Sequence, residues 1–222
     1  MKRPQVIFFD AVGTLFGVRG SVGEVYGQLA QKHGVEVDPK QLNEAFYQQF
    51  KASPPCMFPE ANSTDIPRLE YRWWGAIASK TFRQVGVFDQ FKNFSEFFSE
   101  VYSHFATTEP WIVYRDTVPT LERLRKLDIP LGIISNFDSR IHPVLKALNL
   151  SDYFSSITIS TKAGVAKPDA RIFQIALKKH DCAAEMAWHI GDSAKEDYEA
   201  AKLAGLRGIL VDRDLQANRE SK

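Results

Sequence analysis

Several polar residues spread along the chain are of the types that carry out phosphoryl chemistry. Carboxylates that lie close together repel one another unless a cation separates them, and oxygen ligands at an open site suit Mg²⁺. A lysine and a hydroxyl group beside them would supply a positive charge and a hydrogen bond to a phosphoryl group. An aspartate next to that group can act as a nucleophile and form an aspartyl-phosphate. The residues are Asp10, Thr14, Ser135, Asn136, Lys167, Asp192 and Asp197.

Short apolar runs, rich in β-branched and aromatic residues, precede these polar residues and are typical of strands buried on both faces. They cover residues 6–9, 131–134, 157–159, 187–190 and 208–211. Amphipathic stretches typical of helices lie between them, at 117–127, 138–148, 168–179 and 193–203. The alternation predicts an α/β fold with a Rossmann-like, doubly wound parallel sheet. Since such sheets bind ligands at the carboxyl ends of their strands, we expect the polar side chains to meet at one exposed rim.

Residues 17–108 have a different pattern. Four helical stretches follow one another, at 22–33, 39–52, 65–85 and 89–105, without a convincing strand between them. We therefore predict an all-helical cap domain at 17–108, inserted into a core domain formed by 1–16 and 109–222. Aromatic residues at helical spacing are more typical of a small domain's core than of a substrate pocket, so we assign them to the core of the cap. They are Phe46, Phe50, Trp73, Trp74, Phe82, Phe94, Phe97, Phe98, Tyr102 and Phe105.

The composition excludes several classes of partner. The 222 residues carry 28 Lys and Arg against 27 Asp and Glu, so no global charge attracts nucleic acid or an anionic membrane. No run reaches the roughly 18 to 20 apolar residues of a membrane span. Cys56 and Cys182 are too few for a disulfide framework, which favours the cytoplasm. We expect a monomer or homodimer that acts on a small phosphorylated molecule.

Four motifs resemble those of the haloacid dehalogenase superfamily, whose members are mostly phosphohydrolases. They are Phe9-Asp10-Ala11-Val12-Gly13-Thr14-Leu15, Ile134-Ser135-Asn136, Lys167-Pro168-Asp169 and Gly191-Asp192-Ser193-Ala194-Lys195-Glu196-Asp197. The helical insertion resembles the type-one cap of that superfamily. Trp73-Trp74, Ser135-Asn136-Phe137-Asp138 and Arg171-Ile172-Phe173-Gln174 are most similar to the subfamily of haloacid-dehalogenase-like hydrolase domain-containing protein three.

The resemblance implies a role for each motif residue. Asp10 would be the nucleophile and a Mg²⁺ ligand, together with Asp192 and the backbone carbonyl of Val12. Asp197 would be an acidic group near the metal. Thr14, Ser135 and Asn136 would contact the substrate, and Lys167 would neutralise the charges of both the nucleophile and the phosphoryl group.

Val12 is the main departure from the family pattern. The phosphatases of the superfamily carry a second aspartate at this position, which protonates the leaving group and then activates water. The loss of such an acid and base costs about 10²- to 10⁴-fold in rate. Three explanations stay open: the cap supplies the missing acid, the substrate has a good leaving group, or the site binds without turnover.

Two other functions are therefore possible interpretations of the sequence. A 2-haloacid dehalogenase, working through an ester on Asp10, also lacks the second aspartate, because a halide leaves without a proton. Against it, Asp192 and Asp197 keep the acidic pattern of a metal site, and Gln41 stands where we would look for a halide-binding arginine, with Arg68 and Arg72 farther along. The third possibility is a regulatory protein that binds metal and anion with little catalysis. We expect His189 and His142 to be structural residues without carboxylate partners.

Overall fold

The computed structural model describes residues 3–213, so the outer ends of the predicted core domain, 1–2 and 214–222, lie outside the described residues. Its main sheet has five strands in the order β5-β4-β1-β6-β7, and every neighbouring pair is parallel. The strands are β1 (Val6–Phe9), β4 (Leu131–Ser135), β5 (Ser156–Ile159), β6 (Ala187–Gly191) and β7 (Arg207–Leu210). The predicted α/β fold with a parallel sheet is confirmed.

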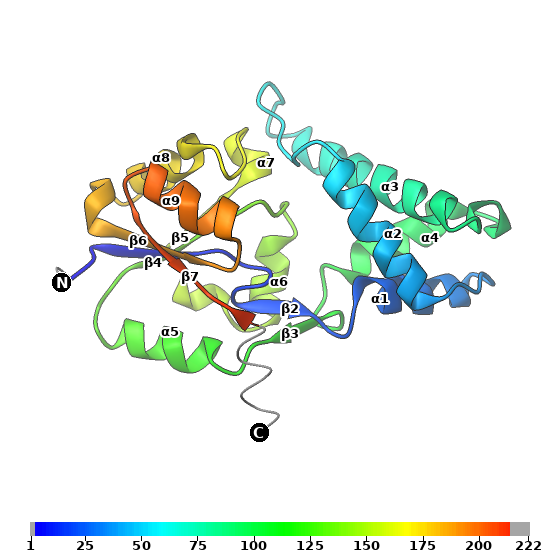
Figure 1. Ribbon diagram of the computed structural model, residues 1–222, viewed down its shortest axis with the longest axis horizontal. Coiled ribbons are helices and arrows are strands. Elements are labelled where there is room, and N and C mark those ends of the chain that lie inside the picture. Colours follow the sequence, from blue (N-terminus) through cyan, green and yellow to red (C-terminus); the bar gives the residue numbers. More distant parts are fainter. Residues whose placement is uncertain (1–2, 214–222) are drawn as a thin grey trace.

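Helices cover both faces of this sheet because β1 is apolar on both sides. Ile7 and Phe9 pack with α5 (Thr117–Arg125) and α6 (Ile141–Ala147) in one buried cluster. Val6 and Phe8 face the other way and pack with α8 (Ala170–Lys178) and α9 (Ala200–Leu203). Figure 1 shows α8 and α9 above the sheet and α5 below it. A doubly wound sheet follows from this alternation, since neither face of β1 is left to water.

Several element ends differ from the sequence prediction. The predicted helix 138–148 begins only at Ile141, because the Asp138 carboxylate accepts a hydrogen bond from the Arg140 backbone N–H and forms a turn. The predicted helix 168–179 begins at Ala170, after Asp169 caps it. The predicted helix 193–203 is divided into a π-helix, η4 (Ala194–Glu199), and α9.

A second, two-stranded sheet was not predicted. It pairs β2 (Phe16–Val18) with β3 (Trp111–Val113) in antiparallel register, and it joins the parallel sheet to the helical insertion. Its strands are only three residues long, too short for the alternation of apolar and polar residues to be recognised. β2 crosses the predicted boundary between residues 16 and 17, and the division into domains stays a prediction.

Four helices form the insertion, on the opposite side of β2 and β3 from the sheet (Figure 1): α1 (Val22–Lys32), α2 (Pro39–Ala52), α3 (Ile66–Gln84) and α4 (Phe94–His104). Side chains of Ser21, Asp38 and Asn93 cap α1, α2 and α4. The helices enclose a buried apolar cluster of their own, rich in phenylalanine.

The smaller elements are α7 (Ser160–Ala163) and the 3₁₀ helices η1 (Phe88–Gln90), η2 (Ser151–Tyr153) and η3 (Ala184–Met186). Within residues 3–213, no helix is both long and apolar enough to cross a membrane.

Candidate active site

The side chain of Lys167 joins two carboxylates at the carboxyl end of the parallel sheet. Its Nζ lies 2.7 Å from Oδ1 of Asp10, which directly follows β1, and 2.5 Å from Oδ1 of Asp197. All three side chains are buried, and Lys167 is only 3% exposed. The expectation that Lys167 and Ser135 lie at an exposed rim is therefore wrong. Ser135 is 4% exposed, and it lines a cavity that side chains of the insertion also line.

Asp197 lies in η4 and is held by three groups. Besides Lys167, its Oδ1 lies 2.8 Å from Nε2 of His189, and its Oδ2 accepts a hydrogen bond from the backbone N–H of Ser193 at 3.0 Å. The expectation that His189 has no carboxylate partner is wrong, since β6 places its ring against Asp197. Gly191 is required here because a Cβ at this position would lie 2.2 Å from Cγ of Asp197. Asp197 is thus a buried part of the site.

The electrostatics of this cluster follow from burial and from one ammonium shared by two carboxylates. Burial raises the pKa of Asp10 to about 7, although Lys167 lowers it and Asp197 raises it further. The pKa of Asp197 is lowered, because His189 and Lys167 outweigh the effect of burial. The two carboxylates raise the pKa of Lys167 in spite of its burial. Asp10 is therefore the member of the cluster whose charge is least compensated by the protein.

Asp192 comes from the next loop, after β6, and faces Asp10. The Thr14 hydroxyl donates a hydrogen bond to Oδ1 of Asp192 at 2.9 Å. Thr14 is 2% exposed and does not line the cavity described below, and its predicted contact with the substrate stays a prediction. Gly13, at a φ of +90°, permits this approach, because a Cβ there would lie 2.4 Å from Oδ2 of Asp192.

These carboxylates fit a divalent cation. Asp10, Asp192 and Asp197 each offer one oxygen, and the three oxygens lie within 4.8 Å of one another. Lys167 supplies one positive charge against three carboxylates, and burial raises the pKa of Asp192 as well as that of Asp10. Both oxygens of Asp197 already accept hydrogen bonds, so Asp10 and Asp192 are the two that would hold a cation directly. The part of the Val12 carbonyl in such a site stays a prediction.

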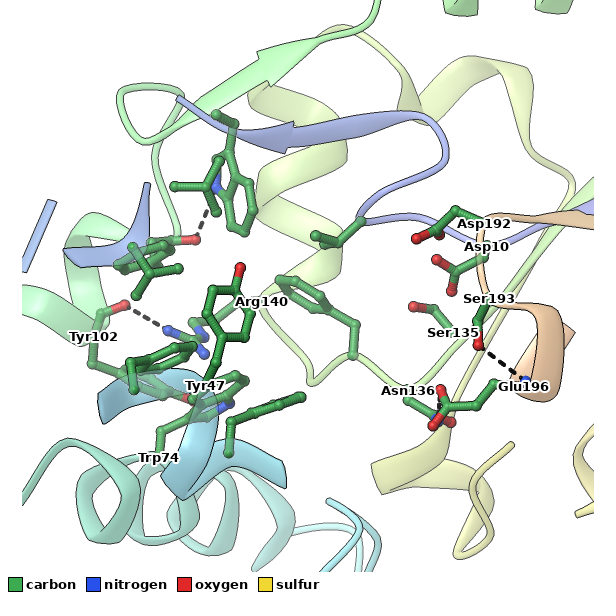
Figure 2. A pocket seen from close by; sticks show the side chains of 18 of the residues that line it. Asp10, Tyr47, Trp74, Tyr102, Ser135, Asn136, Arg140, Asp192, Ser193 and Glu196 are labelled. Atoms are coloured by element: carbon green, nitrogen blue, oxygen red, sulfur yellow. Dashed lines mark hydrogen bonds between the residues drawn. The ribbon is translucent and has the colours of Figure 1, made fainter. Parts of the chain in front are cut away.

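Ser135 and Asn136 lie beside this cluster, but their side chains make different contacts. The Ser135 side chain faces Asp10 and Asp192 in Figure 2 and lines the cavity. The Asn136 side chain instead fixes the loop of Lys167, since its Oδ1 accepts from the Lys167 N–H at 2.8 Å and its Nδ2 donates to the Lys167 carbonyl at 3.0 Å. Asn136 also donates to Glu196 at 3.2 Å. Glu196 is not among the predicted site residues, although it immediately precedes Asp197 in the fourth motif.

A cavity of about 380 Å³ opens above the carboxylates and extends between the sheet and the insertion. Figure 2 shows Asp10, Asp192 and Ser135 at one end, and Tyr47, Trp74 and Tyr102 at the other. Most of the cap aromatics assigned to a core do pack in the apolar cluster of the insertion, and several of them also line the cavity. Phe82 and Phe97 are fully buried, whereas other aromatic residues of the insertion line the cavity. The latter are Tyr26, Phe46, Tyr47, Phe50, Trp74, Phe98, Tyr102 and Phe105.

The segment after β4 connects the insertion to the sheet, and these contacts were not predicted from the sequence. Asp138 accepts hydrogen bonds from Trp74 Nε1 at 2.6 Å and from Nε and Nη2 of Arg140 at 2.9 and 2.6 Å. The buried carboxylate of Glu70, on α3, accepts from the backbone N–H and the hydroxyl of Ser139, both at 2.9 Å. The position of this segment, directly after a predicted buried strand, is a signal that could have identified it.

Comparisons with known proteins identify the family to which the sequence is similar. The family model of haloacid dehalogenase-like hydrolases matches residues 4–205. Haloacid dehalogenase-like hydrolase domain-containing protein 3 of Danio rerio is 34% identical over 209 residues, which cover 93% of this chain and 84% of the relative.

Two solved structures resemble the fold. A haloacid dehalogenase-type phosphatase from Thermococcus onnurineus has a TM-score of 0.62 at 24% identity, covering 95% of this chain and 87% of the other. A 2-haloacid dehalogenase from Pseudomonas syringae pv. Tomato has the same TM-score and identity, covering 93% and 86%. Both structures show the fold alone, and the choice between a phosphatase and a dehalogenase must come from the site.

Proposed function

This chain belongs to the haloacid dehalogenase-like hydrolase family, and we propose that it is a Mg²⁺-dependent phosphatase of small phosphorylated molecules. The observation that carries the proposal is the position of the Asp10 carboxylate. It lies at one end of the cavity, within 2.7 Å of the Lys167 ammonium and close to the carboxylate of Asp192. A carboxylate nucleophile, a fixed positive charge and a set of oxygen ligands for a cation are the parts that phosphoryl transfer requires.

The reaction would proceed in two steps on Asp10. Oδ1 of Asp10 accepts a hydrogen bond from the Lys167 ammonium, so Oδ2 would be the oxygen that attacks phosphorus. The bond from phosphorus to the leaving oxygen breaks, and the leaving group departs with the electron pair. Water then attacks the phosphorus of the aspartyl-phosphate, whose bond to Asp10 breaks. The carboxylate is regenerated and the phosphate keeps both protons of the water. A bound Mg²⁺ would offset the negative charge of the phosphoryl oxygens.

The chain's own residues have separate parts in this scheme. Lys167 compensates the charge of Asp10 and of the incoming phosphoryl group, and Asn136 holds the Lys167 loop. The Ser135 hydroxyl is available as a hydrogen-bond donor at the same end of the cavity. Thr14 orients Asp192. Asp197 keeps Lys167 charged and in place, because it accepts a hydrogen bond from its ammonium.

The dehalogenase remains the second candidate, because Val12 lines the cavity where the phosphatases carry an acid. The three close carboxylates favour the phosphatase: without a cation they repel one another, and a dehalogenase has no need of a metal. Arg140 is the arginine of the cavity wall, but its Nε and Nη2 donate to Asp138 and its Nη1 to the Tyr102 carbonyl. The charge of Arg140 is therefore already compensated by Asp138, which makes it a poor halide-binding group.

One assay separates these functions. Phosphate release from acetyl phosphate and p-nitrophenyl phosphate is measured with Mg²⁺ and with a chelator, beside chloride release from 2-chloropropionate. We expect Mg²⁺-dependent phosphate release that Asp10→Asn abolishes and that Asp89→Asn, at an exposed position of the insertion, leaves intact. Chloride release in the chelator would establish the dehalogenase instead. No reaction with any substrate would favour a binding protein.

A further inference from the structure

The end of the cavity away from Asp10 is built from parallel aromatic rings. Phe46 and Trp74 have an interplanar angle of 4° with their centroids 6.4 Å apart, and Phe50 lies within 21° of both planes at 6.0 and 5.8 Å. All three line the cavity. Such faces bind flat apolar groups by stacking, which contributes about 0.5–1.5 kcal/mol per ring pair beyond the burial of area. The wall is therefore suited to a planar aromatic ring.

Charge is distributed unevenly around the cavity. Among the lining residues of the described chain, five charged ones belong to the sheet end that would hold the phosphoryl group: Asp10, Lys167, Asp192, Glu196 and Asp197. Near the aromatic wall the charged lining residue is Arg140. Its guanidinium donates to Asp138 and to the Tyr102 carbonyl, and it stacks on the Tyr102 ring at 3.8 Å. A carboxylate or ammonium on the leaving group would meet no uncompensated partner there, and burying it would be costly.

Val12 restricts the kind of leaving group that the site can release. Its side chain is apolar, lines the cavity near Asp10, and can give no proton to that oxygen. An alkoxide is about as basic as hydroxide, whose parent water has a pKa of about 15.7. A phenolate such as that of tyrosine has a parent pKa of about 10 and can leave without protonation. The site therefore favours a phenolic or a still less basic leaving oxygen.

We propose that the substrates are aryl phosphates whose ring carries no charge, with the ring stacked on Phe46, Phe50 and Trp74 and the phosphoryl group at Asp10. This inference rests on the proposed phosphatase function. The bond between phosphorus and the phenolic oxygen breaks, the phenolate leaves with the electron pair, and solvent water protonates it. The cavity of about 380 Å³ is within the range of small-molecule sites, so a one- or two-ring phosphate is the expected size.

The test compares substrates that change one property at a time, each measured as kcat/KM with Mg²⁺. Phenyl phosphate and O-phospho-L-tyrosine share a phenolic leaving group but differ in charge, and benzyl phosphate keeps the ring but leaves as an alkoxide. We expect phenyl and 2-naphthyl phosphate to exceed each of the other two by about tenfold or more, equivalent to about 1.4 kcal/mol. Equal kcat/KM values for phenyl phosphate and phosphotyrosine would overturn the preference for an uncharged ring. Equal kcat/KM values for phenyl and benzyl phosphate would overturn the preference for a phenolic leaving group.

Two variants test the aromatic wall. Phe50→Leu removes a stacking ring, so we expect the ratio of kcat/KM for 2-naphthyl phosphate to that for acetyl phosphate to fall about fivefold, which corresponds to roughly 1 kcal/mol. The control Phe88→Leu changes a half-buried phenylalanine of the insertion that does not line the cavity, and we expect no change in that ratio. An unchanged ratio in both variants would contradict the assignment of the wall.

Acetyl phosphate and a binding measurement separate this inference from the proposed function. If neither acetyl phosphate nor any aryl phosphate is hydrolysed, the proposed phosphatase function is wrong. The ring-binding wall is then judged by calorimetry with benzylphosphonate and methylphosphonate, which do not turn over. We expect benzylphosphonate to bind about tenfold more tightly. Equal affinities would overturn the aromatic site whatever the enzyme does, whereas hydrolysis of acetyl phosphate without any aryl preference would overturn the inference alone.

Discussion

At the scale of single residues, the replacement of an acid by Val12 is the feature with the clearest kinetic consequence. In the proposed reaction Val12→Asp would place a proton donor beside the leaving oxygen. We expect kcat for benzyl phosphate to rise by about 10²-fold, the lower end of what a positioned acid contributes. Phenyl phosphate should gain much less, because its leaving group needs little protonation. The isosteric control Val12→Thr should give neither gain, and a failure of Val12→Asp to accelerate benzyl phosphate in a folded protein would count against this account.

Asp10 gives the metal-free protein a characteristic pH dependence. Its pKa is 3.8 in the unfolded chain and is raised by burial to about 7 in the folded one, so the folded state binds this proton more tightly. The stabilisation is complete below pH 3.8 and is lost as the pH rises through about 7. In a chelator we expect the free energy of unfolding in urea to fall between pH 5 and pH 7.5, by more than the roughly 1.4 kcal/mol that one pKa unit represents.

Mg²⁺ and Asp10→Asn provide the controls for this titration. A cation held by Asp10 favours the ionised carboxylate, so added Mg²⁺ should remove most of the fall in stability at pH 7.5. Asp10→Asn should remove both the fall and the response to Mg²⁺. If the wild-type protein in chelator were as stable at pH 7.5 as at pH 5, the raised pKa of Asp10 would be refuted.

Lys167 is buried between two carboxylates, contrary to its expected exposure, and we expect it to stabilise the fold. Lys167→Met would leave Asp10 and Asp197 buried without their shared ammonium, and breaking a buried ion pair costs about 3–5 kcal/mol. For a chain of this length the fall in Tm is then on the order of 10 °C. The control Lys178→Met, on the exposed side of α8, should change Tm by no more than about 1–2 °C. Equal Tm values for the two variants in a calorimeter would show that the buried pair contributes little.

The chemistry of the site was more predictable than its burial. Asp10, Lys167, Asp192 and Asp197 were found from their types and their places after apolar runs, because the carboxyl ends of parallel strands meet at one edge. The burial of Lys167 could not be found in this way, since it depends on contacts with Asp10 and Asp197, which come from distant parts of the chain. The contact between His189 and Asp197 was missed for a related reason, because it joins a strand to a π-helix that was predicted as an ordinary helix.

At the scale of elements, the contact between α3 and the segment after β4 determines how the insertion meets the sheet. Glu70 is 1% exposed and accepts three hydrogen bonds, two from Ser139 and one from Thr161 Oγ1 at 2.6 Å. Both partners belong to segments next to the sheet, whereas Glu70 lies in the insertion. A single carboxylate therefore connects α3 both to the segment after β4 and to α7.

Removal of that carboxylate should loosen the insertion. In Glu70→Ala the donors of half-buried Ser139 and buried Thr161 lose their acceptor, at about 1–3 kcal/mol for a buried group left unsatisfied. We expect a larger radius of gyration in small-angle X-ray scattering and an increased KM for any substrate that fills the cavity. The control Glu44→Ala changes an exposed carboxylate of α2 and should alter neither quantity. An unchanged radius of gyration in Glu70→Ala would mean that other contacts are sufficient to hold the insertion in place.

The elements of the parallel sheet were predicted to within a few residues because strong burial patterns define them. All five strands overlap the predicted runs, and α5, α6 and α8 lie within predicted helices. Local hydrogen bonds account for the differences. At η4, for example, Asp197 N and Tyr198 N both bond to the Ser193 carbonyl, at 3.0 and 3.1 Å. A π-turn of this kind leaves no trace in apolar periodicity.

At the scale of the whole molecule, the fully buried apolar residues of the described chain separate into clusters that do not mix the insertion with the sheet. Two clusters, one on each face of the sheet, contain residues only from 6–16 and 111–206, and the third contains residues only from 22–101. Half-buried Val18 and Phe105 contact both groups. This distribution is what two separately folding parts of one chain would require, and it leads to a direct test of the predicted division.

Excision of the insertion should leave a folded protein. Val18 and Trp111 are paired across β2 and β3, so residues 19–110 can be replaced by Asn-Gly, a two-residue turn suited to a hairpin. Asp10, Lys167, Asp192 and Asp197 all lie in the part that remains. We expect the shortened chain to unfold cooperatively on heating, as measured by circular dichroism, and to hydrolyse acetyl phosphate with Mg²⁺. It should show no preference for phenyl phosphate over phosphotyrosine, because the aromatic wall is absent. The same excision with Asp10→Asn controls for contaminating phosphatase. A shortened chain without a cooperative transition would show that the sheet depends on the insertion for its stability, and a retained aryl preference would show that the wall is not what selects the ring.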